Sequence, residues 1–338
     1  MYVALLALSL FVGCLLAVQS SVNLQLSGAV KTPYGASTLQ LSVAAAALAV
    51  VALAAGTIGA VSLVPDVTWW HLIGGIASPI YITSGILLFP RIGALAAVGL
   101  FVTGQVFASL ALDLFGLLGV PQQSLTVGIV VGGLAVLVGI TLIIRQPKPA
   151  APKDAPKDAE AAKGPESKSS AGKSLGAMAK TTSPSGVGAA GWIALGVVAG
   201  AVLPIQGAIN GKLRTDLDAP LTVGMISFIV ATLSIAIATV ILVATKRTPT
   251  PQVKPLAKMP WWGWLGGFCA ATYVVVTFLA IPEIGAATTV ALTVTGQQLF
   301  SAVIDNYGLF RMPKRALTSR RIAGLALLVL GSVLVQFA

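Results

Sequence analysis

Long apolar runs, each about the length of a membrane-crossing helix, recur along the whole chain. A helix needs about 20 apolar residues to cross the hydrocarbon of a bilayer. These runs are unbroken rather than alternating, which favours helices over the strands of a membrane barrel. Ten runs are long enough: 2–22, 36–64, 70–89, 92–112, 125–144, 190–210, 220–245, 261–281, 284–304 and 320–337. The pattern predicts an all-α integral membrane protein with ten transmembrane helices.

Prolines and tryptophans mark the ends of several runs. We expect Pro90 and Pro282 to break the chain between neighbouring helices, because proline lacks an N–H donor and clashes with the preceding turn. The 36–64 run is over-long, so we expect it to be tilted or partly interfacial. The tryptophans at run ends are interpreted as interfacial anchors; they are Trp69, Trp70, Trp261, Trp262 and Trp264.

The segment between the fifth and sixth runs has a different composition. Residues 146–188 are rich in Lys, Ala, Pro and Ser and contain no aromatic residue. Such a sequence cannot bury enough apolar surface to fold, so we expect a disordered linker. The linker divides the chain into a membrane unit at 1–145 and another at 189–338.

An internal duplication relates these two units. From Trp69 and from Trp261 the halves align without a gap, and 23 of 58 positions are identical. Matched Gly, Pro, Gln and Asp residues carry the similarity, so it is not a chance resemblance of apolar runs. The pairs include Gln19/Gln206, Asn23/Asn210, Gly74/Gly266, Tyr81/Tyr273, Pro90/Pro282, Gln105/Gln297 and Asp113/Asp305.

Five spans in each half require the halves to insert in opposite orientations. Inverted repeats of this kind recur in secondary transporters. Of the 21 Lys and Arg residues, all but Lys212 and Arg214 then fall on the side of the linker. The positive-inside rule places that side in the cytoplasm. We therefore expect two inverted five-helix repeats in the cell membrane, with the linker cytoplasmic and both termini outside.

Three sets of polar residues fall inside or at the ends of the spans, where polar groups are costly and mark function. Each set occurs in both halves. The candidate substrate-binding residues are Gln19, Asn23, Tyr81, Thr103, Gln105, Ser109, Gln206, Asn210, Tyr273, Thr295, Gln297 and Ser301. Helical spacing places Gln105 and Ser109 on one face with Asp113. These side chains either line a cavity between the halves or join neighbouring helices by hydrogen bonds.

Two aspartates at span ends are candidates for coupling transport to protons or another ion. Asp113 and Asp305 would lie at helix C-termini, where the helix dipole disfavours an anion. Arg311 is the structural partner that we expect for Asp305. Pro204 has no counterpart in the first half, where Ala17 stands, so the helix of the second copy is expected to break there.

Composition excludes several classes of protein. Only 9% of the residues are charged, against about a quarter in soluble domains. The net charge of +11 comes from loops and the linker, so it is an insertion signal and not evidence for nucleic acid. With Cys14 and Cys269 inside apolar runs and a single histidine, His71, we expect no disulfide, no metal or other cofactor, and no enzymatic activity. His71 itself is interpreted as an interfacial residue.

Several motifs resemble those of a known family. Pro204, Gln206 and Asn210, the Trp-Trp pair at 261–262 with Gly266-Gly267, and Thr295-Gly296-Gln297 look like the YdcZ-like bacterial inner-membrane exporter domain. That family belongs to the drug/metabolite transporter superfamily, and this chain resembles a fused pair. The resemblance implies export of small molecules. The superfamily's small multidrug members use a membrane-embedded Glu, and this sequence has none at a span centre.

We therefore expect a secondary transporter that exports a small metabolite or drug-like molecule by alternating access between its halves. The alternative is a non-transporting membrane scaffold that acts through its linker and basic loops. The expected partners are a small-molecule substrate and membrane lipid, without nucleic acid. Because both inverted halves are fused, the chain is expected to function as a monomer.

Overall fold

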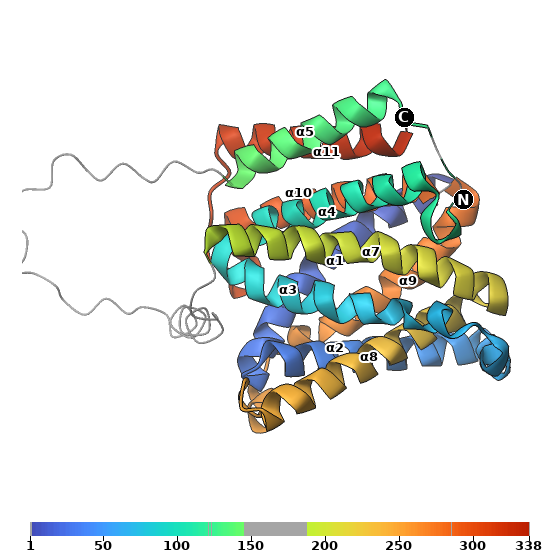
Figure 1. The fold of residues 1–338 in the computed structure, drawn as a ribbon. Helices are drawn as coiled ribbons and strands as arrows, with labels where there is room; N and C mark the ends of the chain where they lie inside the picture. The colour runs from blue at the N-terminus through green and yellow to red at the C-terminus, as the bar shows by residue number, and fades with distance from the viewer. Residues whose placement is uncertain (1, 121, 123, 145–187, 285, 338) are drawn as a thin grey trace, which may run out of the picture.

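The computed structural model describes residues 2–120, 122, 124–144, 188–284 and 286–337, so the predicted linker lies almost wholly outside the described part (Figure 1). Within that part the chain is helical, without strands. The α-helices are α1 (Tyr2–Val30), α2 (Pro33–Ala54), α3 (Ala77–Ile92), α4 (Ala94–Phe115), α5 (Val127–Ile144), α7 (Ala189–Leu217), α8 (Pro220–Ala244), α9 (Leu265–Ile284), α10 (Ala286–Tyr307) and α11 (Ser319–Phe337).

Short 3₁₀ segments connect some of these helices. They are η1 (Ile58–Asp66), η2 (Trp69–Ile76), η3 (Leu117–Gly119), η4 (Lys254–Lys258), η5 (Trp261–Trp264) and η6 (Leu309–Arg311). Eight helical segments of the described chain are long and apolar enough to cross a membrane, with η2 and α3 counted as one. Helices α9 and α10 occupy the remaining two predicted runs, and ten spans remain a prediction. The described part of the protein is all-helical, and most of its helices have the length and composition of membrane spans.

Two helices extend well beyond the apolar runs that predict them. Helix α1 continues to Val30 and α7 to Leu217. The added turns are polar, yet Asn23 and Ser27 of α1 are buried against other helices. Contact with protein rather than lipid therefore lets the helix continue where hydropathy alone predicts its end. The over-long 36–64 run is divided between α2 and η1.

The predicted breaks at prolines are wrong in three described places, one of which is Pro282, inside α9. Helix α3 passes through Pro90 and ends at Ile92, where Gly93 adopts φ = 90°. Helix α7 is continuous through Pro204. A proline removes one hydrogen bond, but a fully opened backbone in hydrocarbon would leave several groups unsatisfied, so the helix persists. The turn forms instead at Gly93, because only glycine tolerates this positive φ without strain.

The two halves interlock rather than standing side by side. Helix α1 packs against α9 and α10 of the other half, and α7 packs against α3 and α4. The second helices, α2 and α8, pair with each other, as do the fifth helices, α5 and α11. In Figure 1, the α5–α11 pair lies at the top of the bundle and the α2–α8 pair at the bottom. Every main contact between helices is therefore made across the two halves.

Glycines allow these crossings to be unusually close. A Cβ on Gly104 of α4 would lie 1.9 Å from the Val197 carbonyl oxygen of α7. At the equivalent crossing, a Cβ on Gly296 of α10 would lie 2.1 Å from the Leu10 carbonyl oxygen of α1. Small residues at helix crossings let backbones approach and gain van der Waals contact in a membrane. Gly104 and Gly296 are equivalent positions of the two repeats, so the same small residue permits both close crossings.

The fifth helices repeat this device in an antiparallel arrangement. A Cβ on Gly132 would meet the carbonyl of Gly331 at 2.8 Å, and one on Gly139 would meet that of Gly324 at 2.7 Å. The seven-residue spacing places both glycines of each helix on one face.

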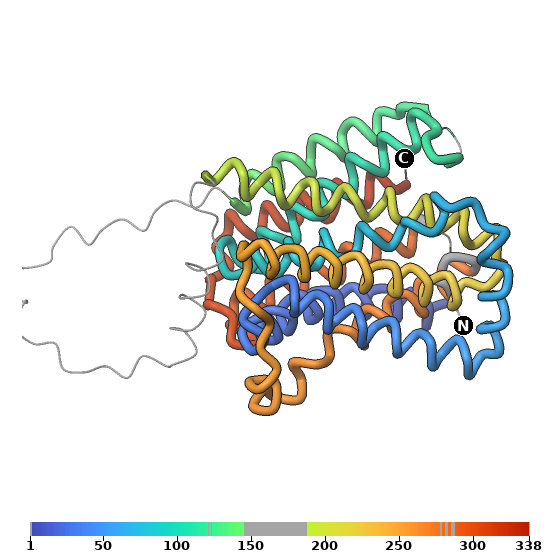
Figure 2. Tube along the Cα trace, turned by 60° about the horizontal axis from the view of Figure 1, so that its bottom comes forward, coloured from blue at the N-terminus to red at the C-terminus, as the bar shows by residue number. Residues whose placement is uncertain are grey.

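Figures 1 and 2 show α5 ending and α7 beginning at one end of the bundle, and the chain termini at the other.

Candidate functional site

A hydrogen bond joins the two halves near the middle of their helices. The Gln297 side-chain amide of α10 donates to the Tyr81 hydroxyl of α3 over 2.8 Å. Both side chains are buried, and the Tyr81 ring packs against Phe101 of α4 at 4.7 Å between centroids. Two of the candidate residues, one from each half, are thus brought together in the core of the bundle.

A second polar cluster surrounds Gln206 on α7. Its amide nitrogen donates to Ser78 of α3 over 2.8 Å and lies 3.3 Å from the Ser227 hydroxyl of α8. Asn210, one turn later, donates to the same Ser227 hydroxyl over 3.1 Å. The expected common face of Gln206 and Asn210 is therefore present. The four side chains connect the first half to two helices of the second.

The serines of this cluster were not singled out from the sequence. Ser78 and Ser227 align with Ala270 and Gln40 in the other repeat, so a search for matched polar pairs passes over them. The sequence signal that could have identified Ser78 is its position three residues after the glycine pair Gly74-Gly75. Ser78 lies close to the contact between α7 and η2, where a Cβ on Gly74 would meet Asn210 Oδ1.

The corresponding amides on α1 are more enclosed. Gln19 and Asn23 are buried, and the side-chain oxygens of both accept no hydrogen bond within the described part of the chain. Asn23 Oδ1 lies against Gly266 of η5–α9, as Asn210 lies against Gly74. Nearby, Gln40 donates to the Gly266 carbonyl over 3.3 Å. The inverted repeat therefore places the same amide–glycine contact at both ends of the bundle.

The candidate hydroxyls of the fourth helices bond within their own helices. Thr103 donates to Gly99, Thr295 to Ala291 and Ser301 to Gln297, each over 2.6–2.8 Å. Those donors are therefore occupied. Gln105 and Ser109 are half-buried. Tyr273, also half-buried, lies beside Thr277 and within electrostatic range of Tyr81.

The Asp305 side chain is held by contacts from two other helices, α4 and α11. Its carboxylate accepts hydrogen bonds from the backbone N–H groups of Ala94 and Leu95 over 2.7 and 3.2 Å. It also accepts from the Arg321 guanidinium over 2.6 Å, and both side chains are almost wholly buried. The carboxylate thus caps the N-terminus of α4, where the helix dipole favours an anion. This contact compensates for its unfavourable place at the end of α10.

The partner of Asp305 is Arg321 and not Arg311 as expected. Arg311 follows Asp305 closely in sequence, but it has φ = 60° and its guanidinium lies 5.7 Å from the Trp262 ring. Arg321 reaches the carboxylate because α11 begins beside the end of α10. Arg315 lies in the connecting segment, where burial lowers the pKa of its guanidinium and the Asp305 charge raises it. Arg315 also donates to the Arg91 carbonyl over 3.0 Å.

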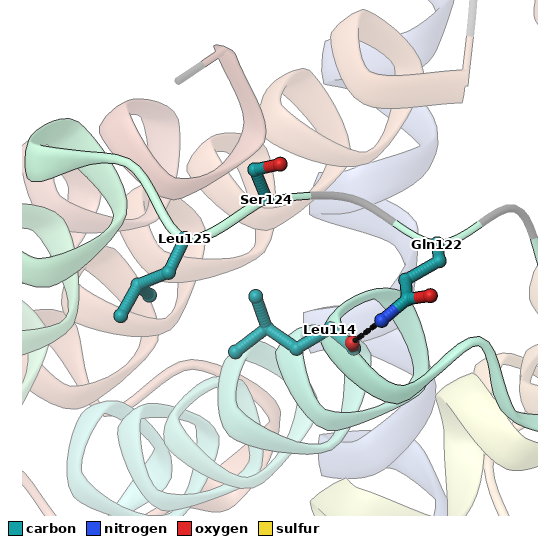
Figure 3. A pocket seen from close by; sticks show the side chains of 4 residues that line it. All are labelled: Leu114, Gln122, Ser124 and Leu125. Carbon is teal, nitrogen blue, oxygen red and sulfur yellow. Dashed lines mark hydrogen bonds between the residues drawn. The ribbon is translucent and has the colours of Figure 1, made fainter.

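Asp113, the repeat counterpart of Asp305, has a different environment. It is half-buried, and no hydrogen bond or ion pair is found for it among the described residues. The position equivalent to Arg321 is Ile129. Beyond Asp113 the chain turns at Gly116, with φ = 60°, and Gln122 donates to the Leu114 carbonyl over 2.9 Å. Figure 3 shows this amide beside an open depression lined by Leu114, Gln122, Ser124 and Leu125.

One ion pair lies at the end of the bundle away from the linker. His71 Nδ1 of η2 is 2.5 Å from Asp216 Oδ2 of α7, and both side chains are partly exposed. Repeat alignment places Gly263 and Ala29 at these positions in the other half, so the pair is asymmetric. His71 therefore joins the halves, and its place at the membrane interface stays a prediction. Among the described residues, no group of three His, Cys, Asp or Glu side chains could hold a metal ion.

Comparison with known proteins identifies a family whose sequences match this chain. The family model described as "Putative inner membrane exporter, YdcZ" matches residues 4–142 and again 191–334. The chain is 32% identical over 91 residues to the inner membrane protein YdcZ of Escherichia coli (strain K12). That match covers 27% of this chain and 60% of the relative.

A solved crystal structure shows the same fold. It superposes with a TM-score of 0.53 and covers 96% of this chain and 95% of its own, at 18% sequence identity. Identity this low establishes the fold alone. The family model matches twice, once on each five-helix repeat, and accounts for most of the described residues. The chain therefore belongs to the YdcZ-like inner-membrane exporter family, as a multi-pass inner-membrane protein with two copies of the domain.

Proposed function

We propose that the chain is a secondary transporter that exports a small, uncharged, hydrogen-bonding molecule by alternating access between its inverted halves. The observation that carries the proposal is the Gln297–Tyr81 hydrogen bond, which joins the halves near mid-helix. Transporters built from inverted repeats bind substrate at the interface between the repeats, near the bilayer midplane. The Gln206–Ser78 bond is a second such contact.

The chemistry of the central side chains supports an uncharged substrate. The candidate site offers amides and hydroxyls, and the buried charges of Asp305 and Arg321 neutralise each other at a helix end. Amides and hydroxyls both donate and accept hydrogen bonds without adding net charge. An ion entering this region would lose hydration without gaining an opposite charge. A neutral polar or amphipathic molecule fits better.

Of the two aspartates proposed for coupling, the geometry favours Asp113. A coupling carboxylate must exchange its proton or ion during the cycle, and half-buried Asp113 has no ion-pair partner among the described residues. Asp305 is fixed by Arg321 and by the α4 N-terminus, so releasing it would break three hydrogen bonds. We assign Asp305 a positioning role and keep Asp113 as the candidate for coupling.

Transport by purified protein in liposomes tests the proposal. A panel of neutral metabolites and drug-like compounds is assayed for counterflow in full-length protein and in Tyr81→Phe and Gln297→Leu variants. We expect at least one compound to exchange and both variants to raise its apparent KM about tenfold, as loss of one hydrogen bond predicts. Unaltered kinetics in both variants would place the substrate elsewhere.

Two further variants test coupling and the scaffold alternative. Asp113→Asn should abolish the pH dependence of flux if this carboxylate carries a proton, and unchanged pH dependence would contradict the assignment. Deletion of residues 150–185 should leave flux intact in a transporter. A chain that moves no compound, but loses a protein partner on this deletion, would instead be a scaffold. We also propose that the linker faces the cytoplasm and that both termini lie outside.

A further inference from the structure

The two ends of the bundle are not equally closed, although the repeat makes them equivalent in sequence. On α1, Ser20 and Leu24 are 7% and 1% exposed. Their counterparts on α7 are Gly207 and Gly211, which are exposed, and a Cβ on either would meet no atom within 4 Å. The inner surface of α7 is therefore open at the end away from the linker, whereas that of α1 is covered at the linker end.

The open surface of α7 faces the bundle and not lipid. On a helical projection of about 100° per residue, Gly207 and Gly211 lie within about 20° of the side of α7 that packs on α4, and Gly207 lies toward the second side, which contacts α3 and η2. Gly200 marks the first side, since its Cβ would meet the Phe101 carbonyl, and Gln206 marks the second through Ser78. Ile205, on the opposite face, is 40% exposed.

The contacts of neighbouring helices show the same asymmetry. Helix α1 contacts α3 of its own half, and a Cβ on Gly85 of α3 would lie 3.9 Å from the Ser20 hydroxyl. The equivalent neighbours are α7 and α9, and no comparable contact is made between them in the described residues. Thr277 of α9 is the counterpart of Gly85. If the open end closed in the way that the linker end is closed, Thr277 would face Gly207, as Gly85 faces Ser20.

The charged side chains at the two ends agree with this difference. At the linker end, Asp305 joins α10 to Arg321 of α11 and to the start of α4. At the other end, Asp113 makes no equivalent bond with described residues. The linker end is thus closed by a fully buried ion pair between α10 and α11, whereas the ion pair at the far end, His71–Asp216, joins η2 to α7 and is partly exposed.

We infer that the structure is the state open to the side opposite the linker, and that Gly207 and Gly211 form the wall through which an uncharged substrate reaches the central site. Tyr273 and Thr277 of α9 are the repeat counterparts of Tyr81 and Gly85, so they are the residues that would face these glycines. In the opposite state α7 closes on α9, which glycines permit because they leave no side chain in the way. The inference rests on the proposed function for its substrate, but its geometry can be tested without one.

Cysteine accessibility tests the opening directly. The full chain with Cys14→Ala and Cys269→Ala serves as background, and a charged, membrane-impermeant maleimide is applied to vesicles of each orientation. A linker cysteine, Ser169→Cys, reports which side is exposed. From the side opposite the linker, Gly207→Cys and Gly211→Cys should react at least tenfold faster than Ile205→Cys. Ser20→Cys, probed from the linker side, should react as slowly as Ile205→Cys.

Ile205→Cys is the matched control because it lies two residues from Gly207 on the lipid-facing side of the same helix. Equal rates for Gly207→Cys and Ile205→Cys would overturn the inference, since Gly207 would then face lipid or a closed interface. A Ser20→Cys rate equal to that of Gly207→Cys would also overturn it, because both ends would be open to the same extent.

Cross-linking gives a second, independent measurement, which still tests the inference if one of the labelling variants fails to fold. With a short bifunctional thiol reagent, the pair Ser20→Cys and Gly85→Cys should cross-link in most molecules, and the pair Gly207→Cys and Thr277→Cys in few. The reverse order would contradict the inference. Neither measurement needs a substrate, so the expected labelling in a protein that transports nothing would reject only the proposed function. If the protein transports a compound but the Gly207→Cys thiol does not react, only the inferred opening would be rejected.

Discussion

Arg321 donates a hydrogen bond to Asp305 over 2.6 Å, with both side chains buried between α10 and α11. The same carboxylate caps the first turn of α4, which belongs to the other half. One residue therefore fixes three helix ends at the side of the linker. Arg321 is itself held in place, since it also donates to the carbonyls of Arg315 and Ala316.

Removing one member of this pair should destabilise the protein strongly. Asp305→Asn leaves a buried guanidinium without its counter-charge, which costs about 3–5 kcal/mol of unfolding free energy. Arg321→Met should cost a similar amount, and the double variant less than the sum. Chemical unfolding in detergent measures these differences. Asp113→Asn is the control at the equivalent position, and a loss there as large as in Asp305→Asn would contradict this account.

The Gln297–Tyr81 bond predicts a measurable coupling energy between the halves. Tyr81→Phe and Gln297→Leu should each cost about 1 kcal/mol, and a double-mutant cycle should give a coupling of about 0.5–1.5 kcal/mol. Unfolding midpoints of the four proteins supply the cycle. Additive effects would show that the two side chains act independently. The cycle separates structural loss from any change in transport kinetics.

Close backbone contact predicts that even a methyl group is harmful at Gly104. Its Cβ would lie 1.9 Å from the Val197 carbonyl, so α4 and α7 must separate. We expect Gly104→Ala to destabilise by about 1–3 kcal/mol despite alanine's better helix propensity. The control is Gly59→Ala, where the added Cβ meets nothing within 4 Å. Thermal unfolding of both variants is compared, and equal midpoints would contradict the predicted clash.

The ion pair of His71 and Asp216 should contribute little to stability. Both side chains are partly exposed, so water and salt screen their interaction. Asp216→Asn should therefore lower the free energy of unfolding by less than about 1 kcal/mol. The difference should shrink further at 1 M salt, where the Debye length is about 3 Å. A loss comparable to that of Asp305→Asn would show that the pair is desolvated in the membrane.

Orientation can be checked by labelling at the ends of the chain. The charge distribution predicts that a cysteine at Ser169 is protected from impermeant reagent in intact cells, whereas one at Ala338 reacts. The structure places the start of α1 and the end of α11 at the same end of the bundle, away from the point where α5 ends (Figure 1). Labelling of Ser169→Cys alone from outside would reverse the orientation.

Much of the architecture follows from patterns that the sequence contains. Apolar run length predicts the helices, because hydrocarbon admits few other structures. Matched residues such as Gln105 and Gln297 identify the duplication, and the family matches confirm the resemblance. Helix ends are predicted less well: α1 continues to Val30 through polar turns that neighbouring helices bury, and α7 continues to Leu217 through turns that are largely exposed.

The site divides in the same way. The sequence by itself determined that paired amides, hydroxyls and aspartates lie on membrane helices, because their spacing and repetition are one-dimensional facts. Only the tertiary structure decided that Gln297 meets Tyr81, that Ser78 and Ser227 join Gln206, and that Asp305 pairs with Arg321. These contacts cross between helices, and those of Gln297 with Tyr81 and of Gln206 with Ser78 also cross between halves. Which side chains meet therefore depends on helix crossing and rotation, which run length and repeat alignment do not specify.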